Sequence, residues 1–149
     1  GNCKFKQLLY WFFKKSDKVL YIGTPELLEF AVANSKETYY VSPEKIIMKH
    51  PRLKKFEENP EIFDLSRLPK KLDRIVNYLP LNLMTSFKVI GKYIELLEHG
   101  QNILIKANVP RKQMQYMDMI IQDIFPEFKL IFVSYIEIEG QKYILGKKL

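Results

Sequence analysis

"KVLYIGTPELLEF", residues 18–30, is the stretch that decides how this chain folds. An apolar run from Val19 to Ile22 stops at Gly23, and apolar residues at helical spacing begin after Pro25. Proline suits the first turn of a helix, where its missing N–H costs nothing. A strand, a glycine turn and a helix in this order open many nucleotide-binding folds. A loop that wraps a nucleotide closely usually has two or three glycines, and this loop has one.

The rest of the chain continues the alternation of strand and helix patterns. Such alternation predicts an α/β fold, a three-layer sandwich with a mostly parallel sheet covered on both faces. Further strands are predicted at 37–42, 61–64, 72–80 and 102–107, and helices at 4–16, 25–35, 43–50, 87–99 and 111–125.

The end of the chain breaks this alternation. Two strand patterns, 128–140 and 141–149, follow each other with no room for a helix, so they predict an antiparallel hairpin that turns near Glu139 and Gly140. We expect seven strands in all, with the hairpin as the only antiparallel pair and the last strand inserted beside the fifth.

Length and composition indicate one domain, residues 1–149, with residues 1–16 as an N-terminal helix packed on the core. The apolar run Leu8 to Phe13 is too short to span a bilayer, and no cleavage site follows it, so we expect neither membrane nor signal peptide. The single cysteine, Cys3, fits a reducing, cytoplasmic location. His50 and His99 lack cysteine or acidic neighbours, so no metal site is expected.

The formal net charge of +7 and the sequence pI of about 9.4 favour an anionic partner, nucleic acid above all. Lysine alone gives affinity without specificity, so a solvated basic surface remains an alternative. Basic residues gather in three groups, which are Lys4, Lys6, Lys14 and Lys15; Lys45, Lys49, Arg52, Lys54 and Lys55; and Lys70, Lys71 and Arg74.

Three segments make the chain resemble the Rossmann-like (class I) S-adenosylmethionine-dependent methyltransferases, as a divergent member. "KVLYIG" is similar to the first motif of that family, and "EIFDLSRLPKKLDRIV" to the segment that joins its third and fourth strands. "NYLP" stands where the family often has Asp or Asn followed by Pro. The resemblance implies that S-adenosylmethionine binds at the carboxyl ends of the strands. The residues at those positions are Gly23, Thr24, Ser42, Asp64 and Asn77.

The first motif departs from the family pattern, which reads as an acidic residue and then Gly-x-Gly. Tyr21 stands near the acidic position, and Pro25 stands where the second glycine would be. Ser42 replaces the usual acidic residue after the second strand, with Glu44 two residues on. A serine cannot accept from both ribose hydroxyls as a carboxylate does, so we expect weak cofactor binding.

Two of these residues also have purely structural interpretations. Gly23 can be the turn glycine between strand and helix, and Asp64 can be the N-cap of the segment that follows it.

Lys106, at the end of the fifth predicted strand, is similar to a catalytic lysine of the FtsJ-like ribose 2′-O-methyltransferases. Asn77 falls where that branch has an aspartate, and Gln141 near its glutamate. Both are neutral amides that can hold geometry but cannot stabilise a charged lysine. Asn77 and Lys106 are our candidate catalytic residues.

The leading functional prediction is therefore a methyltransferase, or a divergent relative, that acts on a macromolecule, with RNA as the expected substrate. The alternative is a non-catalytic protein of the same fold that binds nucleic acid or a protein partner. A dinucleotide-binding domain shares the strand, glycine and helix opening, but the C-terminal hairpin argues against it.

Overall fold

All strands of the computed structural model, which describes residues 2–14, 16–138 and 140–149, belong to one seven-stranded sheet in the order β3-β2-β1-β4-β5-β7-β6. The chain adds β2 and β3 on one side of β1 and then crosses back to place β4 on the other side. The strand order therefore reverses between β1 and β4. The strands are β1 (Ser16–Gly23), β2 (Ser35–Val41), β3 (Leu53–Phe56), β4 (Leu72–Tyr78), β5 (Leu97–Lys106), β6 (Leu130–Ile138) and β7 (Gln141–Lys148).

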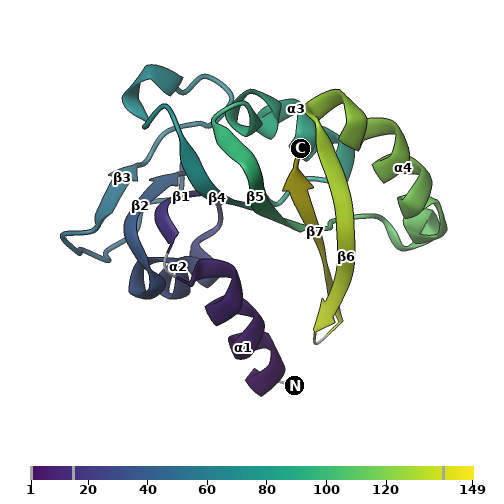
Figure 1. Cartoon of the computed structure of the whole chain (residues 1–149), viewed down its shortest axis with the longest axis horizontal. Helices are drawn as coiled ribbons and strands as arrows, with labels where there is room; N and C mark the ends of the chain where they lie inside the picture. Colours follow the sequence, from purple (N-terminus) through teal and green to yellow (C-terminus); the bar gives the residue numbers. More distant parts are fainter. Residues whose placement is uncertain (1, 15, 139) are drawn as a thin grey trace.

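Helices cover both faces of the sheet, so the predicted three-layer α/β sandwich is confirmed (Figure 1). One buried cluster joins α1 and α2 to one face, and a second joins α3 and α4 to the other. Within the described residues, no helix combines the length and apolar character needed to cross a bilayer. The helices are α1 (Asn2–Phe13), α2 (Leu28–Asn34), α3 (Leu83–Ile94) and α4 (Met117–Ile124), with 3-10 turns η1 (Pro25–Leu27), η2 (Leu65–Arg67), η3 (Arg111–Tyr116) and η4 (Phe125–Phe128).

The C-terminal hairpin and the place of the last strand are confirmed, because β7 lies between β5 and β6. The expectation that the hairpin is the only antiparallel pair is wrong. β7 runs against both of its neighbours, pairing Ile105 with Ile144 on one side and Tyr135 with Ile144 on the other. A reversed strand inserted between two others must make two antiparallel pairs. Of the predicted turn, Gly140 has a φ of 81°, and Glu139 lies outside the described residues.

The helix predicted at 43–50 is wrong, because this segment forms a bend followed by irregular chain. Ile46 and Met48 pack against the core, whereas Ile47 between them is 97% exposed. That alternation has the period of an extended chain. Side chains satisfy its backbone: Ile46 N donates to Glu57 Oε2 at 2.7 Å, and Lys55 Nζ donates to Ile46 O at 3.3 Å.

The strand predicted at 61–64 is also wrong, and the third strand is β3, residues 53–56. β3 pairs in parallel with β2 at the edge of the sheet, and its two central residues are Lys54 and Lys55. Lysines are common on edge strands, where they discourage pairing with other chains. Residues 61–64 instead belong to a loop of turns that follows β3.

Two helix boundaries shift towards the N-terminus relative to the prediction. α3 begins after Asn82, whose side chain accepts from Thr85 N at 2.9 Å and caps the helix. It ends at Ile94, and His99 and Gly100 lie in β5, where Gly100 has a φ of 82° within a bulge. The predicted helix at 111–125 is divided into η3 and α4.

Candidate functional site

A cavity of about 470 Å³ lies at the carboxyl ends of β1, β2 and β4, where the strand order reverses. Open parallel sheets bind ligands at such switch points, and the volume is in the usual range for small-molecule sites. Loops after four strands and one residue of α3 supply the walls. The lining residues are Gly23, Thr24, Ser42, Pro43, Glu44, Asn59, Pro60, Glu61, Leu79, Pro80, Leu81 and Val89.

The loop after β1 lies against the end of β4, and Gly23 makes that approach possible. A Cβ at Gly23 would lie 2.2 Å from the carbonyl carbon of Tyr78, and the φ of Gly23 is 114°. Next in the chain, Thr24 N donates to Tyr78 O at 3.1 Å. Packing on β4 therefore accounts for this glycine without any ligand, although Gly23 and Thr24 also line the cavity.

Tyr21 holds the turn that follows. Its hydroxyl donates to Thr24 O at 2.6 Å and accepts from Leu27 N at 2.9 Å. Burial raises the pKa of the Tyr21 phenol above its ordinary value, so the hydroxyl keeps its proton as a donor. The residue at the family's acidic position thus serves the loop itself. Leu27 N bonds to Tyr21 and Thr24 N to Tyr78 O, so neither amide is available to a ligand.

The turn after β2 presents a carboxylate to the cavity. Ser42 is buried, and its hydroxyl accepts from Glu44 N at 3.2 Å. Tyr40 OH donates to Glu44 O at 2.9 Å. These bonds fix the backbone of Glu44, whose exposed side chain lines the cavity with Glu61. Among the described lining residues these two are charged, and both are acidic.

Glu44 is mentioned beside Ser42 in the sequence analysis but is not predicted there as a cofactor-binding residue, and Glu61 is not mentioned. The signal for Glu44 was its place just beyond a strand end. The wrong strand at 61–64 concealed Glu61, because the loop after β3 is what brings this residue to the cavity.

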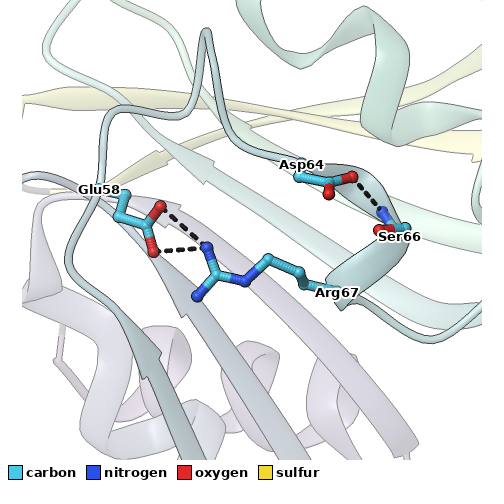
Figure 2. A network of polar contacts seen from close by, with 4 residues as sticks. All are labelled: Glu58, Asp64, Ser66 and Arg67. Carbon is cyan, nitrogen blue, oxygen red and sulfur yellow. Dashed lines mark hydrogen bonds and ion pairs between the residues drawn. The ribbon is translucent and has the colours of Figure 1, made fainter.

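Asp64 lies outside the residues that line the cavity. Its side chain accepts from Ser66 N at 3.0 Å and caps η2 (Figure 2). This hydrogen bond lowers the pKa of the Asp64 carboxyl. In the same loop Arg67 pairs with Glu58 at 2.7 Å (Figure 2) and stacks over Phe56. The loop is therefore tied to β3 by its own side chains.

The two candidate catalytic residues lie on opposite faces of the sheet. Asn77 pairs in register with Ile105, and both belong to the α3 face, whereas the neighbouring Tyr78 belongs to the α1 face. Lys106 lies on that second face, with Nζ 4.7 Å from the centre of the Tyr78 ring. The sheet brings these positions to one edge, but it does not bring the two side chains together.

Asn77 is fully buried. Its Oδ1 accepts from Leu79 N at 3.2 Å, while Nδ2 has no hydrogen-bond partner among the described residues. The Gln141 side chain donates to Lys142 O at 2.9 Å, beside the end of β5. Both amides thus bond to nearby backbone groups.

A larger cavity, about 710 Å³, lies at the opposite end of the sheet, beside His99 and Lys148. Two of its lysines bond to backbone carbonyls: Lys148 Nζ donates to Ile94 O at 2.7 Å, and Lys92 Nζ donates to Glu61 O at 2.9 Å. Burial lowers the pKa of Lys148. The residues that the structure describes contain no group of three or more His, Cys, Asp or Glu side chains that could hold a metal ion.

No protein-family model matches the chain, and no curated protein matches it in sequence. Solved structures do match its fold. The N-methyltransferase NodS from Bradyrhizobium japonicum WM9, in complex with S-adenosyl-L-homocysteine, aligns with a TM-score of 0.66 at 15% identity, covering 97% of this chain and 84% of that one. An rRNA methylase from Streptococcus thermophilus aligns with a TM-score of 0.65 at 13% identity, covering 98% and 95%.

A candidate hemolysin from Lactococcus lactis aligns with a TM-score of 0.71 at 11% identity, covering 99% of this chain and 85% of that one. At these identities the likeness shows the fold alone. The chain has the fold of the class I S-adenosylmethionine-dependent methyltransferases.

Proposed function

We propose that the protein is an S-adenosylmethionine-dependent methyltransferase that acts on RNA and binds its methyl donor in the cavity at the ends of β1, β2 and β4. The observation that carries the proposal is the acidic cavity at the switch point of a methyltransferase fold. Glu44 and Glu61 would repel a pyrophosphate, which disfavours a dinucleotide. They suit a ligand with hydroxyl groups and positive charge.

The polar groups of the cavity fit one end of the cofactor better than the other. Glu44 offers two carboxylate oxygens to a ribose diol, beside the position where Ser42 cannot do so. At the other end the loop offers little, because Thr24 N and Leu27 N are already bonded and Pro25 has no N–H. We therefore propose weak binding. When bound, S-adenosylmethionine supplies an electrophilic methyl group on a sulfonium.

We assign the acceptor side of the reaction to Lys106 and a positioning role to Asn77. Methyl transfer is a direct displacement that depends mainly on alignment and exclusion of water, so few acids or bases are needed. Lys106 is partly exposed at the carboxyl end of β5, where it can contact a phosphate or a target hydroxyl. Asn77 is buried and holds the turn at Leu79, so it acts through the backbone that lines the cavity.

RNA is the proposed substrate because the chain is basic and its lysines are exposed. Lys45, Lys49 and Lys54 lie exposed on segment 43–50 and on β3. Neutralising phosphates releases counterions, which gives affinity for any RNA. The rRNA methylase among the structural neighbours points to the same class of substrate.

Calorimetric titration with S-adenosylmethionine, S-adenosylhomocysteine and NAD tests the cofactor site. We expect weak binding of the first two and none of NAD. Glu44→Gln should weaken binding about tenfold or more, because a charge-assisted hydrogen bond contributes roughly 1.5–3 kcal/mol. Glu29→Gln, an exposed acid on α2 outside the cavity, is the matched control. Ser42→Asp should tighten binding by adding a second carboxylate.

Two results would contradict this account of the site. If Glu44→Gln and Glu29→Gln behave alike, Glu44 does not hold the cofactor. If Asp64→Ala abolishes binding, the carboxylate of Asp64 contacts the cofactor in addition to capping η2.

RNA binding is tested by its dependence on salt. Lys54→Glu with Lys55→Glu should weaken binding to all sequences alike and reduce the slope of log affinity against log salt concentration. Arg111→Glu with Lys112→Glu, on η3, is the charge-matched control. RNA binding without any cofactor binding would favour the alternative function, a non-catalytic protein of this fold that binds nucleic acid.

A further inference from the structure

The outer face of α1 exposes two large aromatic side chains. Tyr10 is 55% exposed and Trp11 is 53% exposed, whereas the next two aromatic residues, Phe12 and Phe13, are buried in the core. The apolar face of the amphipathic helix is thus fully used inside the protein. Tyr10 and Trp11 are left on the surface, where burial in the core cannot explain their size.

The residues around these two aromatics are basic or neutral. Lys4, Lys6 and Lys14 are exposed, and α1 contains no acidic residue. Lys6 and Tyr10 lie four residues apart, on one line along the helix. Lys14 follows in the turn directly after α1, so a cation precedes and a cation follows the aromatic ring along the chain. Trp11 lies one turn from Lys14 on the same exposed face.

One end of α1 lies near Lys106, the residue assigned to the methyl acceptor. The Phe5 ring, near the start of the helix, stacks on Tyr143 with ring centres 5.6 Å apart. Tyr143 pairs in register with Lys106 at the carboxyl end of β5. At the other end of the helix, Phe12 O accepts from Arg74 Nε at 2.7 Å, near the start of β4. A strand lying along α1 would therefore lead to Lys106.

We infer that the outer face of α1 binds single-stranded RNA, with bases stacked on Tyr10 and Trp11 and phosphates at Lys4, Lys6 and Lys14. Aromatic rings alternating with cations suit single strands, because every unpaired base offers a flat face and every nucleotide a negative charge. A membrane surface fits less well, since the apolar face of the helix is buried in the protein. The inference rests on the proposed function only in taking RNA as the substrate.

Trp11 is the only tryptophan of the chain, so its fluorescence reports directly on this face. A single-stranded oligouridine should quench that fluorescence, and a duplex RNA of equal length should quench it much less. Vesicles containing phosphatidylserine should leave the spectrum unchanged. A blue shift with vesicles and no quenching by oligouridine would overturn the inference and indicate a membrane surface.

Anisotropy of a labelled oligouridine then measures the contribution of each group. Trp11→Ala should weaken binding roughly tenfold, and Trp11→Phe should restore most of the loss, because stacking needs only an aromatic face. Lys6→Gln with Lys14→Gln should lower the salt slope by about 1.4 for two lost phosphate contacts. Tyr116→Ala, which removes a 49% exposed ring on η3, is the matched control.

The outcomes separate this inference from the proposed function. If the protein binds oligouridine but Trp11→Ala binds as tightly as the wild type, the α1 surface is wrong while RNA binding stands. If oligouridine quenches Trp11 but S-adenosylmethionine does not bind, the α1 surface stands and the methyltransferase proposal fails. Equal binding of duplex and single-stranded RNA contradicts the stacking arrangement.

Discussion

Gly23 shows how one residue can satisfy two interpretations of a motif. In the sequence it resembles the first glycine of a cofactor loop. In the structure its missing Cβ lets the loop pack on the carbonyl of Tyr78, and its positive φ turns the chain towards η1. Gly23 is therefore needed for folding whether or not a cofactor binds beside it.

Gly23→Ala should be among the most damaging substitutions in the protein. The added methyl group would overlap the Tyr78 backbone, and an L-residue is strained at a φ of 114°. Gly100→Ala is the control, because its φ is 82° and no atom lies within 4 Å of the added Cβ. Urea denaturation should show a loss of about 1 kcal/mol for Gly100→Ala and at least 3 kcal/mol for Gly23→Ala. Equal losses would show that the contact with Tyr78 is relieved by a small shift of the loop.

At the scale of elements, side chains supply backbone hydrogen bonds where the chain departs from the expected helix. In the irregular segment 43–50, Glu57 and Lys55 supply the hydrogen bonds of the Ile46 backbone. The start of the first crossover depends on Tyr21, which bridges Thr24 O and Leu27 N. η1 is thereby held to β1 by one phenol, next to Thr24 in the cavity wall.

Tyr21→Phe should destabilise the protein by about 1–3 kcal/mol, because it leaves the buried Leu27 N–H without an acceptor. The ring itself is kept, so the packing of the core changes little. Urea unfolding followed by circular dichroism measures the loss, and Tyr116→Phe, at an exposed position, provides the control. A loss below 0.5 kcal/mol, on the order of a surface substitution, would mean that water replaces the phenol.

At the scale of the whole molecule, an acidic candidate cavity is combined with a basic surface. The cavity is lined by Glu44 and Glu61, while exposed lysines lie on β3, the segment before it and the outer face of α1. The core contains several buried phenols. Burial raises the pKa values of Tyr21, Tyr78 and Tyr93 above the ordinary tyrosine value.

These phenols predict a steep loss of stability at alkaline pH. The folded chain keeps their protons while the unfolded chain releases them above about pH 10, so their contribution is complete below that pH and is lost as pH rises. Each phenol that ionises only in the unfolded chain costs about 1.4 kcal/mol per pH unit. Lys148 acts in the opposite sense, because its pKa is lowered, but it is a single group.

Urea unfolding at several values between about pH 9 and pH 11 measures this dependence. Tyr93→Phe should reduce the slope, because it removes one of the buried phenols. A free energy of unfolding that stays constant up to about pH 11 would contradict the raised pKa values.

The fold was predictable because its strands carry strong local signals. Each of β1, β4 and β5 contains a short apolar run, and the absence of a helix pattern after Phe128 forces a hairpin. β3 was not predictable, since "LKKF" has no apolar run and becomes a strand only by pairing with β2. The helix expected at 43–50 failed for a related reason. Its apolar residues fit both the helical period and the alternating period of a strand, and contacts with the core decided between the two.

The sequence by itself determined the α/β alternation, the basic surface and the positions of Gly23, Thr24 and Ser42 near a strand end. The tertiary structure decided which side chains meet there. It brought Glu44 and Glu61 to the cavity, turned Asn77 and Lys106 to opposite faces, and left Asp64 as a cap. It also left Trp11 exposed while burying Phe12. Apolar periodicity is local and survives in the sequence, whereas which groups converge depends on strand pairing and loop paths between distant residues.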